Sequence, residues 1–184
     1  MPTHLLQQGR GDLIAPAPQD LGELIRFRDP DKALSVYLCV HPAEGFAINL
    51  TQRDLHWSIG WHIMDEIQPG PQPMLRQVWR QIHVVTHNRD YDPPPQPRLV
   101  FWGTITSIVG QRTTNAEHLE LGIMTLQTRS QIEALALQVP VMAPDGTWNC
   151  QDFLKDLLQK MVEAGIIDKD KKDSVIEMAE EISP

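Results

Sequence analysis

Residues Leu55–Met64 read LHWSIGWHIM, and in this stretch large apolar side chains alternate with small or polar ones. Successive side chains of a β-strand point to opposite faces of the sheet. The alternation therefore predicts a strand with one apolar face and one polar face. The apolar set is Leu55, Trp57, Ile59, Trp61 and Ile63, and the opposite set is His56, Ser58, Gly60 and His62. We expect this strand to be an inner strand of a sheet.

Further strands are predicted on both sides of this stretch, where β-branched and apolar runs end at turn-forming residues. They are Leu34–Val40, Gly45–Leu50, Arg76–His87, Leu99–Val109 and His118–Gln127. Short connections favour antiparallel pairing, and the last two strands are expected to form a hairpin through Gly110–Ala116. The prediction is a mostly antiparallel sheet of five to six strands.

The C-terminal third of the chain has helical periodicity. Ser130 is the predicted N-cap of a short helix that ends before Pro140. The apolar residues of Cys150–Glu163 recur at three- and four-residue spacing, which is typical of an amphipathic helix, and Gly165 can end it. A last, strongly charged helix is predicted over Asp173–Ile182. Helices that follow an antiparallel sheet indicate the α+β class.

A chain of 184 residues is long enough for one domain with its own core. Residues 1–30 contain several Pro and Gly and no sustained periodicity, so we expect a loosely ordered N-terminal arm with a short helical turn near Asp20–Arg26. Residues 31–184 are expected to form a single α+β domain.

Charge and composition exclude several classes of protein. The chain has 16 Lys and Arg against 24 Asp and Glu, a net charge of −8, which disfavours nucleic-acid binding and a polybasic membrane surface. No apolar run approaches the ~20 residues of a membrane span, and the N-terminus lacks the pattern of a secretory signal. The two cysteines, Cys39 and Cys150, do not form a disulfide framework, so we expect a cytoplasmic protein.

The segment Trp148–Phe153, WNCQDF, contains the strongest indication of chemistry. It places Cys150 in the first turn of the amphipathic helix, with Asn149 as the expected N-cap. Free amide hydrogens and the helix dipole favour a thiolate at this position. A nucleophilic thiolate also needs a proton acceptor, and His56 on its strand is the candidate. His83 on a later strand is the candidate for a third group that orients His56.

Simpler interpretations of these residues stay open. A free cysteine is often a buried packing residue, which is the prediction for Cys39 and an alternative for Cys150. A histidine on a strand is often an ordinary packing or surface residue. Tryptophans on strands usually fill a core, but they can also line a pocket, and Trp57 and Trp148 are the candidates for contact with a substrate. The spacing of the histidines predicts no metal site.

The two motifs resemble those of the permuted papain-like fold, to which NlpC-type cysteine peptidases and lecithin:retinol acyltransferase belong. The segment His56-Trp57-Ser58-Ile59 is similar to the His-Tyr-Gly segment of that branch, and Asn149–Phe153 is similar to its Asn-Cys-Glu-His-Phe segment. The chain also resembles a group of uncharacterised fungal proteins. It departs from the acyltransferase pattern at Ser58, where that pattern has Gly, and in the position of the second histidine.

This resemblance implies a permuted papain-like fold with Cys150 as nucleophile, His56 as general base and acid, and His83 as the third polar residue. The expected function is that of a cysteine-dependent hydrolase or acyltransferase. Its substrate would be the amide or ester of a small-molecule, peptide or lipid acyl group, and no cofactor or metal is expected. The alternative is a non-catalytic binding or scaffolding protein that keeps the fold.

Overall fold

The structure is a computed structural model that describes residues 7–8, 27–43, 49–68, 70, 73–88, 97–143 and 147–184. The predicted helical turn near Asp20–Arg26, most of the predicted N-terminal arm and most of the predicted strand Gly45–Leu50 lie outside the described residues. No helix among the described residues is long and apolar enough to cross a membrane.

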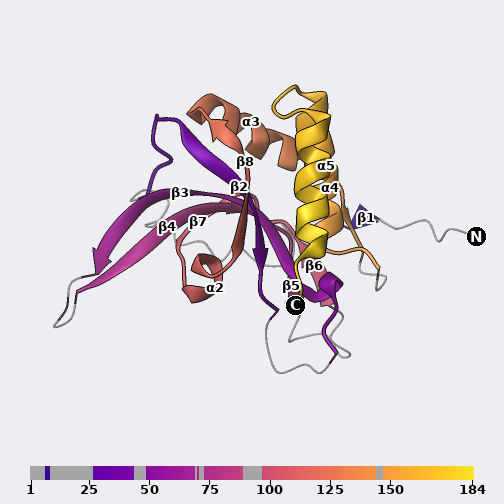
Figure 1. Ribbon diagram of the computed structural model, residues 1–184, viewed down its shortest axis with the longest axis horizontal. Helices are drawn as coiled ribbons and strands as arrows, with labels where there is room; N and C mark the ends of the chain where they lie inside the picture. Colours follow the sequence, from indigo (N-terminus) through magenta and orange to yellow (C-terminus); the bar gives the residue numbers. More distant parts are fainter. Residues whose placement is uncertain are drawn as a thin grey trace, which may run out of the picture.

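The described chain forms an α+β fold, in which an antiparallel five-stranded sheet is followed by three C-terminal helices (Figure 1). The strands are β1 Gln7–Gln8, β2 Leu34–His41, β3 His56–Gln68, β4 Met74–Ile82, β5 Val85–Asn88, β6 Pro97–Val100, β7 Ile105–Ile108, β8 Glu117–Met124 and β9 Val141–Met142. The helices are η1 Gln52–Asp54, α2 Gln111–Thr114, α3 Leu126–Ala136, α4 Cys150–Glu163 and α5 Lys169–Glu181. The α+β class is therefore confirmed.

The large sheet has the strand order β7-β4-β3-β2-β8, so β3 is its central strand, as its alternating pattern predicts. The predicted hairpin through Gly110–Ala116 is wrong, because β7 and β8 lie at opposite edges of this sheet. The connection between them contains α2, and Val109 and Ala116 pack with Cys39 and Trp79 in a second, small cluster. The short connection that contains α2 thus runs from one edge of the sheet to the other instead of forming a hairpin.

Two predicted strands are each divided into two shorter ones. Arg76–His87 becomes β4 and β5, and Leu99–Val109 becomes β6 and β7, because the chain leaves the large sheet and forms a separate β5–β6 pair. Gly103, between β6 and β7, has a φ of 92°, a backbone conformation that favours glycine and lets the chain bend. The hydrophobic pattern continues through both breaks, so periodicity does not reveal the change of partner.

The main core lies between the large sheet and the three C-terminal helices. The buried residues of α4 include Phe153, Leu154, Leu157, Leu158 and Met161, and they pack in one cluster with the apolar face of β3. This burial is the main stabilising contribution, at about 1.5–3 kcal/mol for each large apolar side chain. It also fixes α4 against the central strand.

Helix α4 begins and ends where the sequence predicts. Asn149 is its N-cap and accepts a hydrogen bond from the Gln151 amide at 2.8 Å, while the Asp152 carboxylate accepts from the Asn149 amide at 2.9 Å. Gly165 ends the helix with a φ of 69°. The cap confirms the prediction that Cys150 opens a helix packed against the sheet.

The other two helices begin earlier than predicted. Helix α3 starts at Leu126, because the Thr125 hydroxyl accepts a hydrogen bond from the Thr128 amide at 3.2 Å. Helix α5 starts at Lys169, because Asp168 caps it. In both cases a Thr or Asp N-cap lies upstream of the apolar residues from which the helix was predicted.

Beyond Ile63 the strands β3 and β4 continue as a two-stranded ribbon that projects away from the helices (Figure 1). A β-bulge between His62 and Met64 marks the boundary. Strand β2 pairs with β3 only over residues 56–60, and β7 pairs with β4 only over residues 78–81. Strand β7 reaches the inner end of the ribbon at Val78, and the Val109 amide donates to the Gln77 carbonyl. Farther out, the described ribbon has no paired strand on either side, and it exposes Met64, Ile67, Met74 and Leu75.

Arg129 of α3 is a fully buried charge with a complete set of partners. Its guanidinium donates to both carboxylate oxygens of Asp29, at 3.1 and 2.8 Å, and the accessible fraction of its side chain is 0%. It also donates to the backbone carbonyls of Pro30, Lys32 and Met124. These bonds hold residues 29–32 against the start of α3.

Asp29→Ala should lower the free energy of unfolding by about 3 kcal/mol, because it leaves the buried Arg129 charge without its counter-ion. Glu180→Ala is the control, since it removes an exposed ion pair with Lys155 and should cost less than about 1 kcal/mol. Urea denaturation of both variants measures the difference. Equal losses of unfolding free energy in the two variants would contradict a stabilising role for the buried Asp29–Arg129 ion pair.

Candidate functional site

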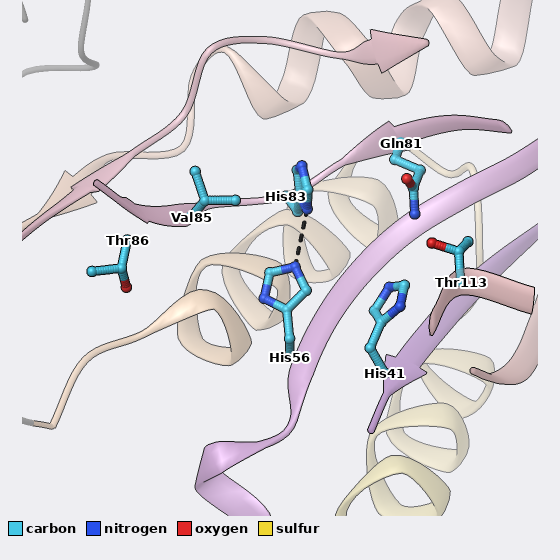
Figure 2. A pocket seen from close by; sticks show the side chains of 7 residues that line it. All are labelled: His41, His56, Gln81, His83, Val85, Thr86 and Thr113. Atoms are coloured by element: carbon cyan, nitrogen blue, oxygen red, sulfur yellow. Dashed lines mark hydrogen bonds between the residues drawn. The ribbon is translucent and has the colours of Figure 1, made fainter. Parts of the chain in front are cut away.

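Helix α4, strand β3 and the short break between β4 and β5 bring together the three residues predicted to carry chemistry, and His83 lies in that break instead of on a strand. His56 begins β3, Cys150 begins α4, and the two are in contact. The backbone N–H of Trp57 donates a hydrogen bond to the Cys150 thiol. His56 Nε2 lies 3.0 Å from His83 Nδ1, a hydrogen bond between the two imidazoles (Figure 2). The order Cys150–His56–His83 is the order that the sequence predicts.

The surroundings of the Cys150 thiol work against its ionisation in this arrangement. Burial raises the pKa of Cys150 above its ordinary value, while the Trp57 amide, the Arg53 charge and the amides of the first turn lower it by less. The expectation that the helix start would leave a stabilised thiolate is therefore wrong for this state. The position supplies the stabilising amides, but the desolvation of a side chain in the core outweighs them.

A third histidine, His41, belongs to the same site. It ends β2 directly opposite His56 in the strand register, and the two ring centroids are 5.4 Å apart. His41 Nε2 forms a hydrogen bond of 2.7 Å with the Ser58 hydroxyl, which also accepts from the Gln81 amide at 3.5 Å. His56 therefore lies between two imidazoles, one on each neighbouring segment.

A cavity of about 390 Å³ opens beside these imidazoles (Figure 2). Six of its seven described lining residues have a polar side chain, and they come from several elements, namely His41, His56, Gln81, His83, Val85, Thr86 and Thr113. No carboxylate is among these lining residues. Cys150 is not among them either, and only 9% of it is exposed. The cavity therefore gives access to His56 and His83 from solvent, but not to the Cys150 sulfur.

The two predicted substrate-binding tryptophans do not line this cavity. Trp57 is fully buried in the main core, and the Lys155 ammonium lies 5.6 Å from the centre of its ring. Trp148 is also buried, with 8% of its surface exposed. Their predicted contact with substrate has no support from this geometry, and both pack as core residues.

Sequence reasoning missed His41, Gln81 and Thr113. A signal for His41 was present, because Tyr37, Cys39 and His41 alternate with the apolar residues of the first strand. A pairing of that strand with the strand of His56 would have placed the two histidines on one face. Gln81 and Thr113 carry no such signal, since they reach the cavity through the pairing of β4 and the course of α2.

Cys39 lies next to this network but is a packing residue, as predicted. It is fully buried and not in a disulfide, and burial raises its pKa to about 12 although a hydrogen bond with Ser58 acts in the opposite direction. In the described part of the chain, no group of three or more His, Cys, Asp or Glu side chains is arranged to hold a metal ion.

Comparisons with protein-family models, curated proteins and solved structures give no match for this chain.

Alkylation of Cys150 by iodoacetamide in native protein should follow a titration midpoint above that of the unfolded chain, because burial penalises the thiolate. The Cys39→Ala variant isolates the Cys150 signal, and mass spectrometry across a pH series measures the rate. A native midpoint below that of the unfolded chain would contradict this effect of burial.

Cys39 should make stability fall at alkaline pH. Its pKa is raised from 9.0 to about 12, so above pH 9 the unfolded chain loses this proton first and is favoured. Relative to Cys39→Ala, the wild-type free energy of unfolding should decline by about 1.4 kcal/mol per pH unit above pH ~9. Denaturation at pH 8 and pH 10 tests this, and a difference between the proteins that is independent of pH would contradict it.

Proposed function

We propose that this protein is a cysteine-dependent hydrolase or acyltransferase that acts on an amide or ester through Cys150, His56 and His83, in a permuted papain-like fold. The observation that carries the proposal is the succession of contacts at one end of the central strand. A cysteine in the first turn of a helix touches His56, and His56 is hydrogen-bonded to His83 at 3.0 Å. A nucleophile, a base and an orienting group in this order are the requirements of covalent acyl chemistry.

The raised pKa of Cys150 determines how the first step would proceed. Because the resting thiol is protonated, the proton would pass to His56 as the sulfur attacks the acyl carbon. With Nε2 directed to His83, Nδ1 is the His56 nitrogen assigned to this transfer. His83 would keep the ring in one orientation and stabilise the imidazolium that forms.

The remaining steps complete an acyl transfer. A carbon–sulfur bond forms, the amide or ester bond breaks, and the leaving group takes the proton from His56. Backbone amides at the start of α4 are the available donors for the negative oxygen of the intermediate. Water or a second nucleophile then attacks the thioester and gives its proton to His56, the carbon–sulfur bond breaks, and the departing Cys150 sulfur takes that proton back from His56.

The cavity supports a polar substrate in preference to a long apolar chain. Its described lining has three imidazoles, one carboxamide and two hydroxyls, and Val85 is its one aliphatic member. Among small-molecule, peptide and lipid acyl groups, the first two match these hydrogen-bonding side chains better.

A non-catalytic binding protein is the second candidate, and the burial of Cys150 favours it. The sulfur does not line the cavity, and desolvation works against its ionisation. A ligand could then occupy the histidine-lined cavity without covalent reaction. The two candidates differ in whether Cys150 is ever acylated.

Incubation with p-nitrophenyl acetate should give an acetyl adduct on Cys150 that turns over. Cys150→Ser should abolish the adduct, and His56→Ala should slow its formation by about 10²–10⁴-fold, the usual contribution of a general base. His83→Ala should slow it less, because His83 acts on the orientation of His56. Intact-mass spectrometry follows the adduct.

Cys39→Ala is the matched control for this experiment, since Cys39 is buried away from the helix start and should not affect the acylation rate. The proposed enzymatic activity would be rejected, in favour of non-catalytic binding, if no Cys150 adduct formed. The same conclusion would follow if the adduct formed at an unchanged rate in His56→Ala.

A further inference from the structure

Gln151 follows the proposed nucleophile, and no role has been assigned to it above. Its side chain is 0% exposed, although it is polar. The Nε2 group donates to the carbonyl of Gln52 at 2.9 Å and to the carbonyl of Leu55 at 3.0 Å. Both hydrogens of the carboxamide are therefore used within one short segment, the segment that leads into His56.

The Leu55 carbonyl belongs to the peptide unit that joins Leu55 to His56. A hydrogen bond to this oxygen restrains the rotation of that peptide plane, and with it the direction in which the His56 side chain leaves the backbone. Cys150 and Gln151 are consecutive in α4, so one helical turn presents the thiol and holds the backbone of the histidine. The distance between the Cys150 thiol and the backbone of His56 is thus determined by adjacent residues of one helical turn.

Other bonds fix the same segment to the start of α4. Asn149 Nδ2 donates to the carbonyl of Arg53 at 3.1 Å. Arg53 in return forms an ion pair with Asp152 at 2.6 Å and donates to the backbone carbonyl of Thr147. Thr51 and Asp54 close the η1 turn through a hydrogen bond of 2.7 Å. The segment 51–55 is therefore a rigid connector and not a free loop.

The bonds of Gln151 differ from these others in burial. The Arg53–Asp152 pair is 41% and 30% exposed, so water can replace its partners at little cost. The Gln151–Leu55 bond is buried, and a carbonyl left there without a donor is not hydrated. Among the α4 residues bonded to the connector, Gln151 is for this reason the one whose loss should most displace the backbone next to His56.

We propose that Gln151 is a positioning residue that holds His56 at the correct distance and orientation from Cys150. This inference rests on the proposed function for its catalytic consequence, but the positioning itself is a property of the fold. Misplacement of a catalytic group by about 1 Å can cost about 10²-fold in rate. By fixing the peptide plane of His56, Gln151 therefore also affects how efficiently His56 acts as a base.

The first experiment measures the position of His56 without any substrate. Gln151→Met keeps a side chain of similar length but has no donors, and Gln151→Glu keeps the shape but places a carboxylate against two carbonyls. With ¹³C-labelled histidine, both variants should shift the NMR signal and titration midpoint of His56. Gln159→Glu, the same chemical change at an exposed position of α4, should leave both unchanged.

Asn149→Ser provides a second route to the same answer if the Gln151 variants fail to fold. It keeps an uncharged cap oxygen and loses the donor to the Arg53 carbonyl, so it should also shift the His56 signal, but by less. An unchanged His56 signal in folded Gln151→Met, or in Asn149→Ser if neither Gln151 variant folds, would overturn the inference whether or not the protein performs acyl chemistry.

The second experiment separates positioning from general support of α4. In the wild-type background, Gln151→Met should slow acylation of Cys150 by p-nitrophenyl acetate at least tenfold. In the His56→Ala background the same change should have less than a twofold effect, because the group through which Gln151 acts is absent. Equal losses in both backgrounds would show that Gln151 only supports the helix.

Failure of the proposed function has a different signature. If His56→Ala alone leaves the rate unchanged, the acyl mechanism is rejected, while a shifted His56 signal in Gln151→Met would still show that Gln151 positions the imidazole.

Discussion

The packing of α4 on the apolar face of β3 is the contact on which the rest of the structure depends. It belongs to the core that buries large apolar side chains of the described chain, among them Trp57, Trp61 and Phe153, and it makes the central strand and α4 one rigid unit. The first turn of the helix then lies beside the first residues of the strand. The contact of Cys150 with His56 follows from this packing, and polar bonds between residues 147–152 and 51–55 refine it.

The parts of the fold that sequence predicts well are those in which a local pattern and burial agree. Alternation over Leu55–Met64 places the central strand, and the 3-4 spacing with an Asn cap places α4 to the residue. Strand pairing is a long-range property with no local signal. The breaks after Ile82 and after Val100 could not be read from periodicity, because the hydrophobic runs continue across both, and nothing local shows that β7 and β8 lie at opposite edges of the sheet.

The same distinction applies to the site. Cys150, His56 and His83 could be selected from residue type and position, and the structure brings them together. His41 was not selected, because its relevance depends on which residue of β3 lies opposite it. The protonation of Cys150 was predicted with the wrong sign, since the helix start is visible in the sequence but the depth of burial is not.

The β3–β4 pair extends from the middle of the core into solvent, and the bulge at Ile63 divides it. Its inner part can exchange its amide hydrogens only when the core opens, because strands flank it on both sides and α4 covers its face. Beyond Gln77, where the Val109 amide still donates to β4, the described outer part has neither support, so it can separate and reform while the rest of the protein stays folded. One continuous strand thus belongs to two cooperative units, and fraying of the outer end stops before it reaches His56 and the other imidazoles of the cavity.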